Sequence, residues 1–295
     1  MNKIYLELRS GLGNQLFQFS FGYSLANGFN KELVLCPSYF DSSWKFLLKK
    51  LLGREARTFR LPLLVSRPFK VMPPNYWKEL LNGSASVQIM DETKVDASTV
   101  RKICAEPNDV YLRGYWQDEK YFSTYRDDLT EIFQPKFDLS ETYKATLNTL
   151  KSNVVGLHVR RGDFLTNKAF GACTIDYYLA AIREVQNTIS DPAFLVFTNN
   201  KAWVKTNFPE SISYKIYPSD NVNSDVEEMF LMSKMKSLII SNSTFSWWSA
   251  YLNRVPDNLI ICPQRWYLSP RLETRTPGLI SNGWKKINNS LELVR

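Results

Sequence analysis

The sequence predicts an α/β fold in two lobes, in which the second lobe holds a parallel sheet covered by helices. The second half of the chain alternates apolar segments of strand length with segments of helical period. Several of these strands, such as residues 195–197 and 238–240, are apolar on both faces, which is typical of parallel strands between two layers of helices. The length of 295 residues suits about two domains with a large buried core.

The first half opens as a strand, a glycine-containing turn, a helix and a second strand. Residues 4–8 alternate apolar with polar or amphipathic side chains, as strands do, and residues 10–14 contain two glycines and an asparagine, as turns do. A helix is expected over residues 14–27, because apolar residues recur there at helical spacing. The second strand is expected at residues 33–36, where the following proline ends it.

Residues 40–110 are the least regular part of the sequence, because prolines between residues 62 and 74 interrupt any long element. Around and after this region the sequence predicts strands at 86–90 and 111–116 and helices at 118–133 and 142–150. We expect the boundary between the lobes near residue 150, which divides the chain into residues 1–150 and 151–295.

The second half shows a regular alternation of strands and helices. The expected strands are residues 153–159, 193–198, 213–217, 237–241 and 258–262. The expected helices are residues 174–190, 200–207, 224–235 and 245–253. In the first of these helices, apolar residues from Ile175 to Ile189 form one stripe, and Thr174 suits the N-cap.

The net charge of +8, from 37 basic and 29 acidic residues, favours anionic partners such as nucleotides, nucleic acid or an anionic membrane surface. Part of the excess lies in residues 45–70, which are rich in Lys and Arg and contain one acidic residue. This segment has two interpretations. It is a basic amphipathic segment in peripheral contact with a membrane surface, or a solvated helix and loop.

The sequence predicts a cytoplasmic location. No apolar run approaches the ~20 residues that span a bilayer. Glu7 and Arg9 interrupt any signal-peptide core near the first residue. The four cysteines lack metal-ligand spacing and three of them adjoin apolar segments, which indicates reduced thiols in the core.

A doubled arginine follows the first strand of the second half, in the stretch Gly-Leu-His-Val-Arg-Arg-Gly-Asp at residues 156–163. Arginine is permanently charged, and its planar fork matches pairs of phosphate oxygens. Arg160 and Arg161, at a strand end before a tight turn, therefore suit a diphosphate. The alternative is a surface pair that makes salt bridges, and these residues alone favour neither interpretation.

Polar clusters also follow two other strands of the same lobe. Residues 199–200 are both asparagine, and residues 241–246 contain five polar side chains before a helix. Ligands of parallel sheets bind outside the carboxyl ends of the strands. Small hydroxyl residues and free amides at a helix start suit an anion. Ser243 or Thr244 also fits a simple N-cap, although an N-cap does not require five polar residues.

Four segments of the chain together resemble the α-1,2-fucosyltransferases, a family of inverting glycosyltransferases that use GDP-fucose. Each segment alone is moderately specific, whereas all four in this order, spanning residues 11 to about 267, are highly specific. The segments are GLGNQLFQFSFGYSLA (11–26), GYWQDEKYF (114–122), GLHVRRGDF (156–164) and LMSKMKSLIISNSTFSWWSAYLN (231–253).

The resemblance implies two Rossmann-like lobes facing across a cleft, the arrangement called GT-B. Residues 1–150 would form the acceptor-side lobe and residues 151–295 the GDP-sugar-binding lobe, with the C-terminal tail packing back on the first lobe. The implied reaction moves L-fucose from GDP-fucose to the 2-hydroxyl of a terminal galactose, with inversion and without a metal or another cofactor. Since no Asp-x-Asp follows any strand of the second lobe, the arginines would neutralise the leaving diphosphate.

The resemblance also implies roles for residues of the doubled-arginine motif. Arg160 would contact the donor phosphates, and His158 would line the guanosine site. Arg161 would be either a second phosphate contact or a structural partner of Asp163. Asp163 is the nearest carboxylate and the candidate general base, with capping of the turn or pairing with an arginine as its alternative role.

Further donor-binding residues are expected elsewhere in the chain. Asn14, in the turn of the first lobe, would reach across to the donor or its sugar. Glu228 stands where relatives tend to have aspartate, and its carboxylate would accept hydrogen bonds from guanine. Four consecutive residues are expected to form the diphosphate cradle: Ser243, Thr244, Phe245 and Ser246.

The sequence also departs from the family, and other functions compete. Relatives often have acidic residues where residues 199–200 are asparagine, and often have His-Gly where Phe170 precedes glycine. Competing functions are another GDP-sugar transferase on the same scaffold, a basic module for nucleic acid or membranes, and a Rossmann dehydrogenase. The last two are disfavoured, because the chain has no low-complexity basic arm and lacks the third glycine of the dinucleotide fingerprint. We therefore expect no nucleic-acid partner. For a cytoplasmic enzyme of this family, a lipid-linked glycan would be a natural acceptor.

Overall fold

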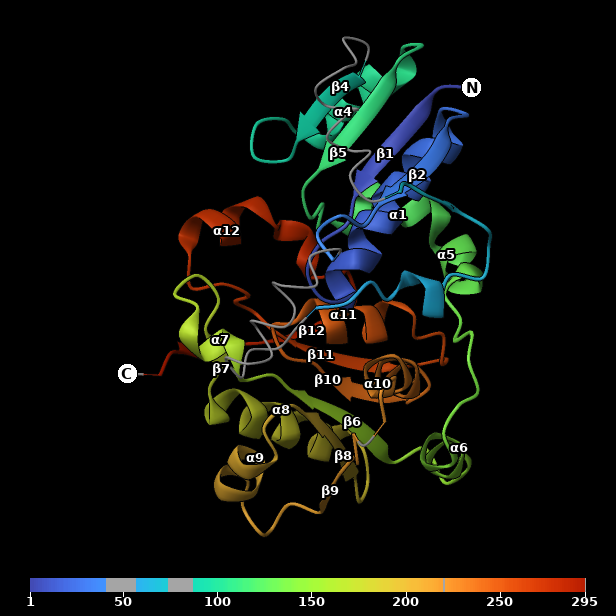
Figure 1. The fold of residues 1–295 in the computed structure, drawn as a ribbon. Coiled ribbons are helices and arrows are strands. Elements are labelled where there is room, and N and C mark those ends of the chain that lie inside the picture. Colours follow the sequence, from blue (N-terminus) through green and yellow to red (C-terminus); the bar gives the residue numbers. More distant parts are fainter. Residues whose placement is uncertain (41–56, 74–86, 220, 295) are drawn as a thin grey trace. The chain divides into compact units, whose positions relative to one another are not determined.

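The computed structural model describes residues 1–40, 57–73, 87–219 and 221–294. The chain forms two compact units, Met1–Lys136 and Phe137–Arg295, and each contains its own parallel sheet (Figure 1). The division lies before the boundary predicted near residue 150. The reason is that helix α6 (Glu141–Asn148) belongs to the second unit, where the amide and hydroxyl of Ser140 each donate to Glu227 at 2.7 Å.

The first unit contains a five-stranded parallel sheet in the order β3-β2-β1-β5-β4. The direction in which successive strands are added reverses at β1 and β5, which are neighbours in the sheet. The strands are β1 (Lys3–Glu7), β2 (Glu32–Cys36), β3 (Lys70–Val71), β4 (Val87–Asp91) and β5 (Asp109–Arg113).

Helix α1 (Leu12–Gly28), which joins β1 to β2, is buried along almost its whole length. It begins two residues earlier than predicted. Gly22 lies where the helix meets the sheet closely, since a Cβ there would lie 3.0 Å from the side chains of both Leu6 and Leu33. Two buried glutamines of this helix have hydrogen-bond partners. The side chain of Gln15 donates to the carbonyls of residues 10 and 58, and that of Gln18 donates to the carbonyl of residue 114.

The helix predicted over residues 118–133 is wrong, because the structure divides it into three short elements. These are η2 (Glu119–Tyr121), η3 (Ser123–Tyr125) and α5 (Arg126–Ile132). Tertiary partners redirect the backbone here: the Tyr121 carbonyl accepts from Ser24 and from Arg101, each at 2.7 Å. The sequence also missed helix α4 (Ala97–Ala105), which Asp96 caps by accepting from the Thr99 amide at 2.7 Å.

Residues 45–56 of the basic segment 45–70 lie outside the described residues, but residues 57–70 are described. There the short helix η1 (Leu61–Leu63) and the residues after it bury Leu61, Leu64 and Val65 completely within the first unit. These three apolar side chains are therefore core residues and do not face a membrane. Among the described helices, none is both long enough and apolar enough to span a bilayer.

The second unit contains a six-stranded parallel sheet in the order β9-β8-β6-β10-β11-β12. Counted along the chain this is 3-2-1-4-5-6, the strand order of the Rossmann fold. The α/β class with two Rossmann-like lobes of GT-B type is thus confirmed. The strands are β6 (Val154–Val159), β8 (Ala193–Thr198), β9 (Tyr214–Ile216), β10 (Ser237–Ile239), β11 (Leu259–Pro263) and β12 (Lys285–Ile287).

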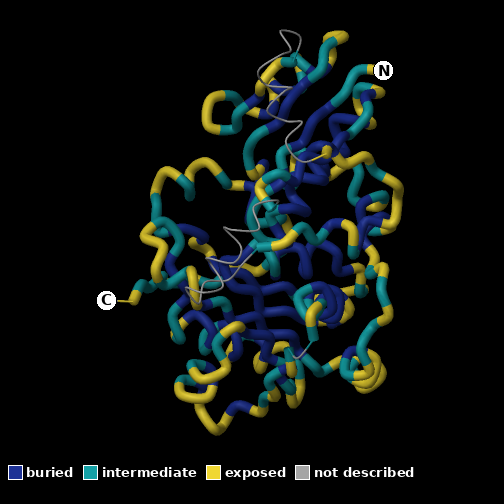
Figure 2. Tube along the Cα trace, in the orientation of Figure 1, coloured by how far each residue is buried: buried dark blue, intermediate teal, exposed yellow. Residues whose placement is uncertain are grey.

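Helices cover both faces of this sheet (Figure 1). The four main helices are α8 (Ile175–Thr188), α9 (Lys201–Asn207), α10 (Ser224–Ser233) and α11 (Thr244–Tyr251). Residues of α8 and α9 join those of β6 and β8 in one hydrophobic core, and α10 packs along α11. Figure 2 shows the buried residues concentrated along the strands of this unit. The predicted alternation of strands and helices is confirmed, with ends that differ by one or two residues.

The four cysteines are free and buried, in agreement with the prediction of core thiols. Burial raises the pKa of Cys36, Cys173 and Cys262 to about 12. These thiols are therefore protonated and unreactive in the folded chain.

The end of the chain belongs to the second unit. Strand β13 (Leu291–Glu292) pairs antiparallel with β7 (Ala172–Cys173) inside the second unit. Glu292 also forms an ion pair with Arg161 of the same unit. The tail is therefore part of the lobe that contains the doubled-arginine motif.

Candidate functional site

The carboxyl ends of β6 and β10 form the topological switch point of the second unit. Connections leave these neighbouring strands in opposite directions, and Rossmann folds bind ligands in the crevice that such an arrangement forms at the strand ends. His158 lies at the end of β6, and its Nδ1 atom is 2.8 Å from the Ser241 hydroxyl after β10. The structure thus brings together two of the polar clusters that the sequence predicted to meet.

His158 is a buried, neutral side chain at this junction. It is 5% exposed, and its ring centroid lies 5.3 Å from that of Phe245. Burial, together with the nearby charge of Arg160, lowers the pKa of His158 to about 3. The imidazole is therefore uncharged at neutral pH, and the positive charge at the end of β6 belongs to the arginines.

Arg160 stands at the start of the turn after β6, with 14% of its side chain exposed. Its guanidinium donates to Asp163 Oδ1 at 2.6 Å and lies 5.5 Å from the centre of the Phe164 ring. Gly162, at φ 60°, reverses the chain between the two partners, a conformation that favours glycine. The Asp163 carboxylate thus holds the Arg160 guanidinium in place.

Arg161 diverges from Arg160 and has different partners. Its guanidinium forms an ion pair with Glu292 and lies 4.1 Å from the centre of the Trp203 ring. Its amide donates to the Asn199 side chain at 2.9 Å, and only 7% of the side chain is exposed. Arg161 therefore has structural partners, but Asp163, the partner that the sequence suggested for it, pairs with Arg160 instead.

The start of α11 supplies the second half of the crevice. Ser243 is the N-cap and accepts weakly from the Phe245 amide, at 3.4 Å. Ser246 is buried and donates to the carbonyls of residues 241 and 243, so its hydroxyl faces the backbone. Thr244 and Phe245 are partly exposed. The first amides of a helix have no partner within the helix and attract anions.

Asn242 is a residue of this site whose role the sequence did not indicate. Its side-chain amide is buried and donates to the carbonyls of Gly171 and Trp266, each at 2.9 Å. The Cys173 thiol donates to its side-chain oxygen at 3.4 Å. Asn242 thereby fastens the loop before α11 to β7 and to the segment after β11. Its place in the polar cluster was visible in the sequence, but its partners were not.

Glu228 lies on α10, the helix that packs along α11. Burial raises the pKa of Glu228 to about 7, with smaller contributions from the charges of Asp225 and Glu227, while a hydrogen bond from Ser219 opposes the rise. The adjacent Glu227 is fully buried and accepts from Ser140 and Asn221, so it is structural. Glu228 is half-buried, and its carboxyl changes charge near neutral pH.

Asn14 lies in the first unit, at the carboxyl ends of β1 and β5, which are the switch point of that sheet. Its side-chain amide donates to the Ser10 hydroxyl at 2.9 Å, and Gln117 donates to its side-chain oxygen at 2.6 Å. The segments 11–26 and 114–122 therefore meet at this point. Ser10 and Trp116 have φ angles of 71° and 54°, so backbone strain concentrates beside Asn14, as at many functional sites.

Three charged residues accompany Asn14 at this edge, and the sequence did not single them out. Glu7 forms ion pairs with Arg9 and with Arg113, in the latter case at 2.9 Å from Nε. One carboxylate thus lies between two guanidiniums, which leaves this edge polar and weakly charged.

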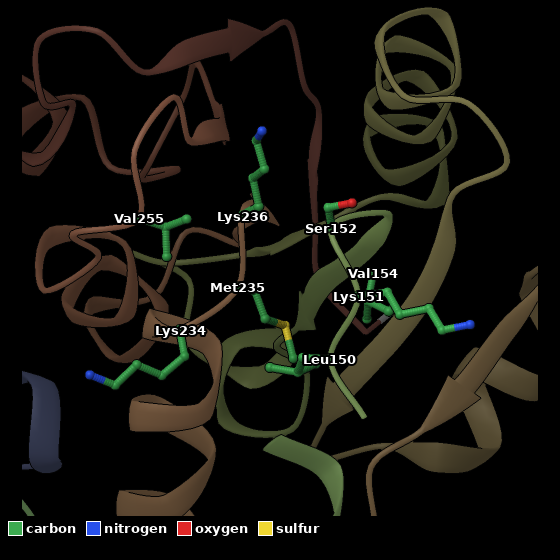
Figure 3. Close-up of a pocket in the computed structure, with 8 residues that line it drawn as sticks. All are labelled: Leu150, Lys151, Ser152, Val154, Lys234, Met235, Lys236 and Val255. Atoms are coloured by element: carbon green, nitrogen blue, oxygen red, sulfur yellow. The ribbon is translucent and has the colours of Figure 1, made fainter. Parts of the chain in front are cut away.

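A cavity of about 200 Å³ lies at the opposite, amino end of the second sheet. Figure 3 shows lysines 151, 234 and 236 extending away from an apolar floor of Leu150 and Met235. It is remote from the strand ends that hold the doubled-arginine motif, so it is not the crevice described above. Within the described ranges, no group of three His, Cys, Asp or Glu side chains is arranged to hold a metal ion.

Two Rossmann-like units, with a basic turn and a helix start at the switch point of the second, define a glycosyltransferase of the GT-B type. Comparison with known proteins identifies the family. The chain belongs to glycosyl transferase family 11, whose profile matches residues 98–288. The resemblance to the α-1,2-fucosyltransferases is thereby confirmed.

Relatives with assigned names support this membership. The α-1,2-colitosyltransferase of Escherichia coli is 30% identical over 94% of this chain and 97% of its own length. The O-antigen biosynthesis glycosyltransferase WbnK of the same species is 29% identical over 90% and 95%, respectively. Galactoside α-(1,2)-fucosyltransferase 2 of Pongo pygmaeus is 27% identical over 48% of this chain and 45% of its own.

A solved structure with a similar fold is the fucosyltransferase NodZ from Bradyrhizobium. It superposes with a TM-score of 0.51 over 84% of this chain and 92% of NodZ, at 12% sequence identity. At this identity the similarity concerns the fold alone.

Proposed function

We propose that the chain transfers L-fucose from GDP-fucose to the 2-hydroxyl of a terminal galactose, with inversion and without a metal ion. The main support is that, in a chain of family 11, Arg160 and the start of α11 lie at the same switch point. The names of two relatives, an α-1,2-colitosyltransferase and a galactoside α-(1,2)-fucosyltransferase, support the linkage. The donor is supported by the basic switch point and by a crystal of NodZ, which has a similar fold, soaked with GDP-fucose.

In this mechanism the second unit stabilises the leaving group. As the bond between the sugar C1 and the phosphate oxygen breaks, its electron pair goes to the diphosphate of GDP. Arg160 and the first amides of α11 face that developing charge, and such fixed dipoles and charges act most strongly in the transition state. Neutral His158 lies at the same junction, in contact with Ser241 and Phe245. It would contact the guanosine of the donor.

The acceptor hydroxyl attacks C1 from the face opposite the diphosphate and loses its proton to a base. Asp163 is the proposed base, but its ion pair with Arg160 supports the alternative role of orienting the guanidinium. Replacing Asp163 by Asn separates the two. A lost turnover with unchanged GDP affinity supports the base. A weaker GDP affinity supports the orienting role, and an unchanged enzyme contradicts both.

A second donor, GDP-colitose, is favoured by one observation. The α-1,2-colitosyltransferase aligns with nearly the whole chain, over 97% of its own length. Colitose is fucose without the 3-hydroxyl. A site that hydrogen-bonds this hydroxyl would strongly reject colitose, whereas a site without such contacts would accept both sugars.

The test is to incubate the purified chain with each donor and a panel of galactosides that differ in the reducing-side sugar. NMR of the product then assigns the linkage and the anomeric configuration. We expect an α-1,2-linked fucosyl galactoside, formed equally well with excess EDTA. Transfer to another hydroxyl, retention of the donor configuration or complete inhibition by EDTA would each refute the corresponding part of the proposal.

The acceptor is proposed to be a lipid-linked glycan, because one relative is named for O-antigen biosynthesis. Peripheral membrane contact would then depend on the part of segment 45–70 that lies before residue 57, since Leu61, Leu64 and Val65 are buried. Transfer rates to the same galactoside, free and displayed on anionic vesicles, test this. Equal rates would count against a membrane-bound substrate.

A further inference from the structure

Residues 290–294, here called the strap, run along the turn that contains the doubled-arginine motif. The Thr174 amide donates to the Ser290 carbonyl at 3.2 Å, and Leu291 and Glu292 pair with β7. The Val294 amide then donates to the Leu165 carbonyl at 3.0 Å, within helix α7 (Asp163–Thr166). The strap lies beyond residue 288, where the family match ends.

One branch of contacts leads from the strap to the Arg160 turn. Glu292 forms the ion pair with Arg161, and the Arg161 guanidinium also lies 4.1 Å from the centre of the Trp203 ring. The Arg161 amide is held by Asn199. Arg161 is thus fixed at its side chain by the strap and α9 and at its backbone by the end of β8. Because Arg160 is the preceding residue, these contacts also set the backbone from which its guanidinium extends.

A second branch leads from the strap to the start of α11. Leu291 pairs with Cys173, whose thiol donates to the Asn242 side chain in the loop before the helix. Asn242 in turn donates to the Gly171 carbonyl at 2.9 Å. Gly171 has φ 70°, and a Cβ there would lie 2.9 Å from that of Leu291, so strap and loop approach closely.

We propose that the strap is a positioning element of the donor site, in which Glu292 acts through Arg161 to align Arg160 with the start of α11. The inference rests on the proposed binding of GDP at this switch point. It assigns Arg161 to positioning and leaves Arg160 as the phosphate contact. It explains why the second arginine of the motif is almost fully buried, although a phosphate ligand must face the substrate.

The experiment compares Glu292→Gln with a matched control, Glu184→Gln. Glu184 of α8 forms an ion pair with Lys285 in the same unit, away from the Arg160 turn, and both variants remove the charge of a partly exposed carboxylate. Calorimetric titration with GDP gives the affinity, and thermal unfolding gives the stability. We expect GDP to bind about tenfold more weakly to Glu292→Gln only, with similar melting temperatures for both variants.

A double-mutant cycle tests whether Glu292 acts through Arg161. If it does, Glu292→Gln will add little to the effect of Arg161→Met on GDP affinity, because the pair is already broken. Steady-state kinetics should show a raised KM for the GDP-sugar and an unchanged KM for the acceptor. Amide hydrogen exchange at residues 161–165 should accelerate in Glu292→Gln and not in the control.

Three results would overturn the proposal: equal GDP affinity of Glu292→Gln and the control, additive effects in the cycle, or unchanged exchange at residues 161–165. A wild-type chain that fails to bind GDP would instead refute the proposed function. In that case the exchange measurement still shows whether Glu292 holds the turn.

Discussion

The two units have the same kind of switch point but opposite chemistry at it. In the first unit, Asn14, Ser10 and Gln117 form a chain of neutral hydrogen bonds, and Glu7 offsets nearby guanidiniums. In the second unit, Arg160 stands beside a neutral histidine and the amide end of a helix. Both positions are set by sheet topology.

This difference suits the two switch points to two kinds of ligand. Neutral amides and hydroxyls satisfy the hydroxyl groups of a sugar without attracting a strong charge. A guanidinium and helix-start amides instead stabilise a diphosphate. We therefore expect changes at the second switch point to affect GDP binding and departure, and changes at the first to affect the sugar.

The largest effect is expected from Arg160→Ala. Loss of the guanidinium should lower kcat/KM by about a hundredfold to a thousandfold, as for other groups that stabilise a leaving charge. Kinetics at saturating acceptor measure this, and circular dichroism checks the fold. Arg271→Ala, at an exposed arginine of the same unit, is the control. A near wild-type rate would remove the basis for assigning the diphosphate to this turn.

A smaller effect is expected from Asn14→Ala. One lost hydrogen bond is worth up to about 1.5 kcal/mol, so kcat should fall by up to about tenfold while the affinity for GDP stays the same. Asn27→Ala, at the other end of α1, serves as the control because Asn27 is exposed. If Asn14→Ala lowered the affinity for GDP, the assignment of the sugar to the first switch point and of GDP to the second would be wrong.

The next effect concerns pH. Because Glu228 has a pKa of about 7, it is protonated below neutrality and charged above it. If the carboxylate accepts hydrogen bonds from guanine, GDP should bind about tenfold more tightly at pH 8 than at pH 6 through this group. Titration of GDP phosphate acts in the same direction, so the wild type is compared with Glu228→Gln. Identical pH profiles of the two proteins would exclude the guanine contact.

The last effect concerns acid stability and leaves the activity at neutral pH untouched. His158 has a folded pKa of about 3, below its usual value, so only the unfolded chain binds a proton as pH falls below about 6.5. This favours unfolding by about 1.4 kcal/mol per pH unit. The pKa of Glu228 is raised in the folded chain, so its protonation between the unfolded and folded pKa values stabilises the fold as pH falls. Both proteins contain Glu228, so its contribution cancels in the comparison. In urea denaturation, His158→Asn should therefore lose less stability than the wild type between pH 6.5 and 5, and parallel losses would contradict the assignment.

Much of the second unit was predictable from the sequence, because its signals are local. Strands that are apolar on both faces alternate with helices of clear period, and their order in the chain limits the sheet to few topologies. The positions of Arg160 and residues 243–246 at strand ends followed from the same pattern. The helix predicted over residues 118–133 failed because Ser24 and Arg101, distant in sequence, take up the Tyr121 carbonyl.

By itself, the sequence determined the class of fold, the family and the three strand ends where polar groups gather. These depend on residues that are adjacent in the chain or repeat at short period. Only the tertiary structure decided that Arg160 and Arg161 diverge, that Asn242 fastens the loop before α11, and that the tail joins the second unit. Glu292 is 131 residues from Arg161, and a partner at that separation is selected by packing and charge in three dimensions, which no local pattern encodes.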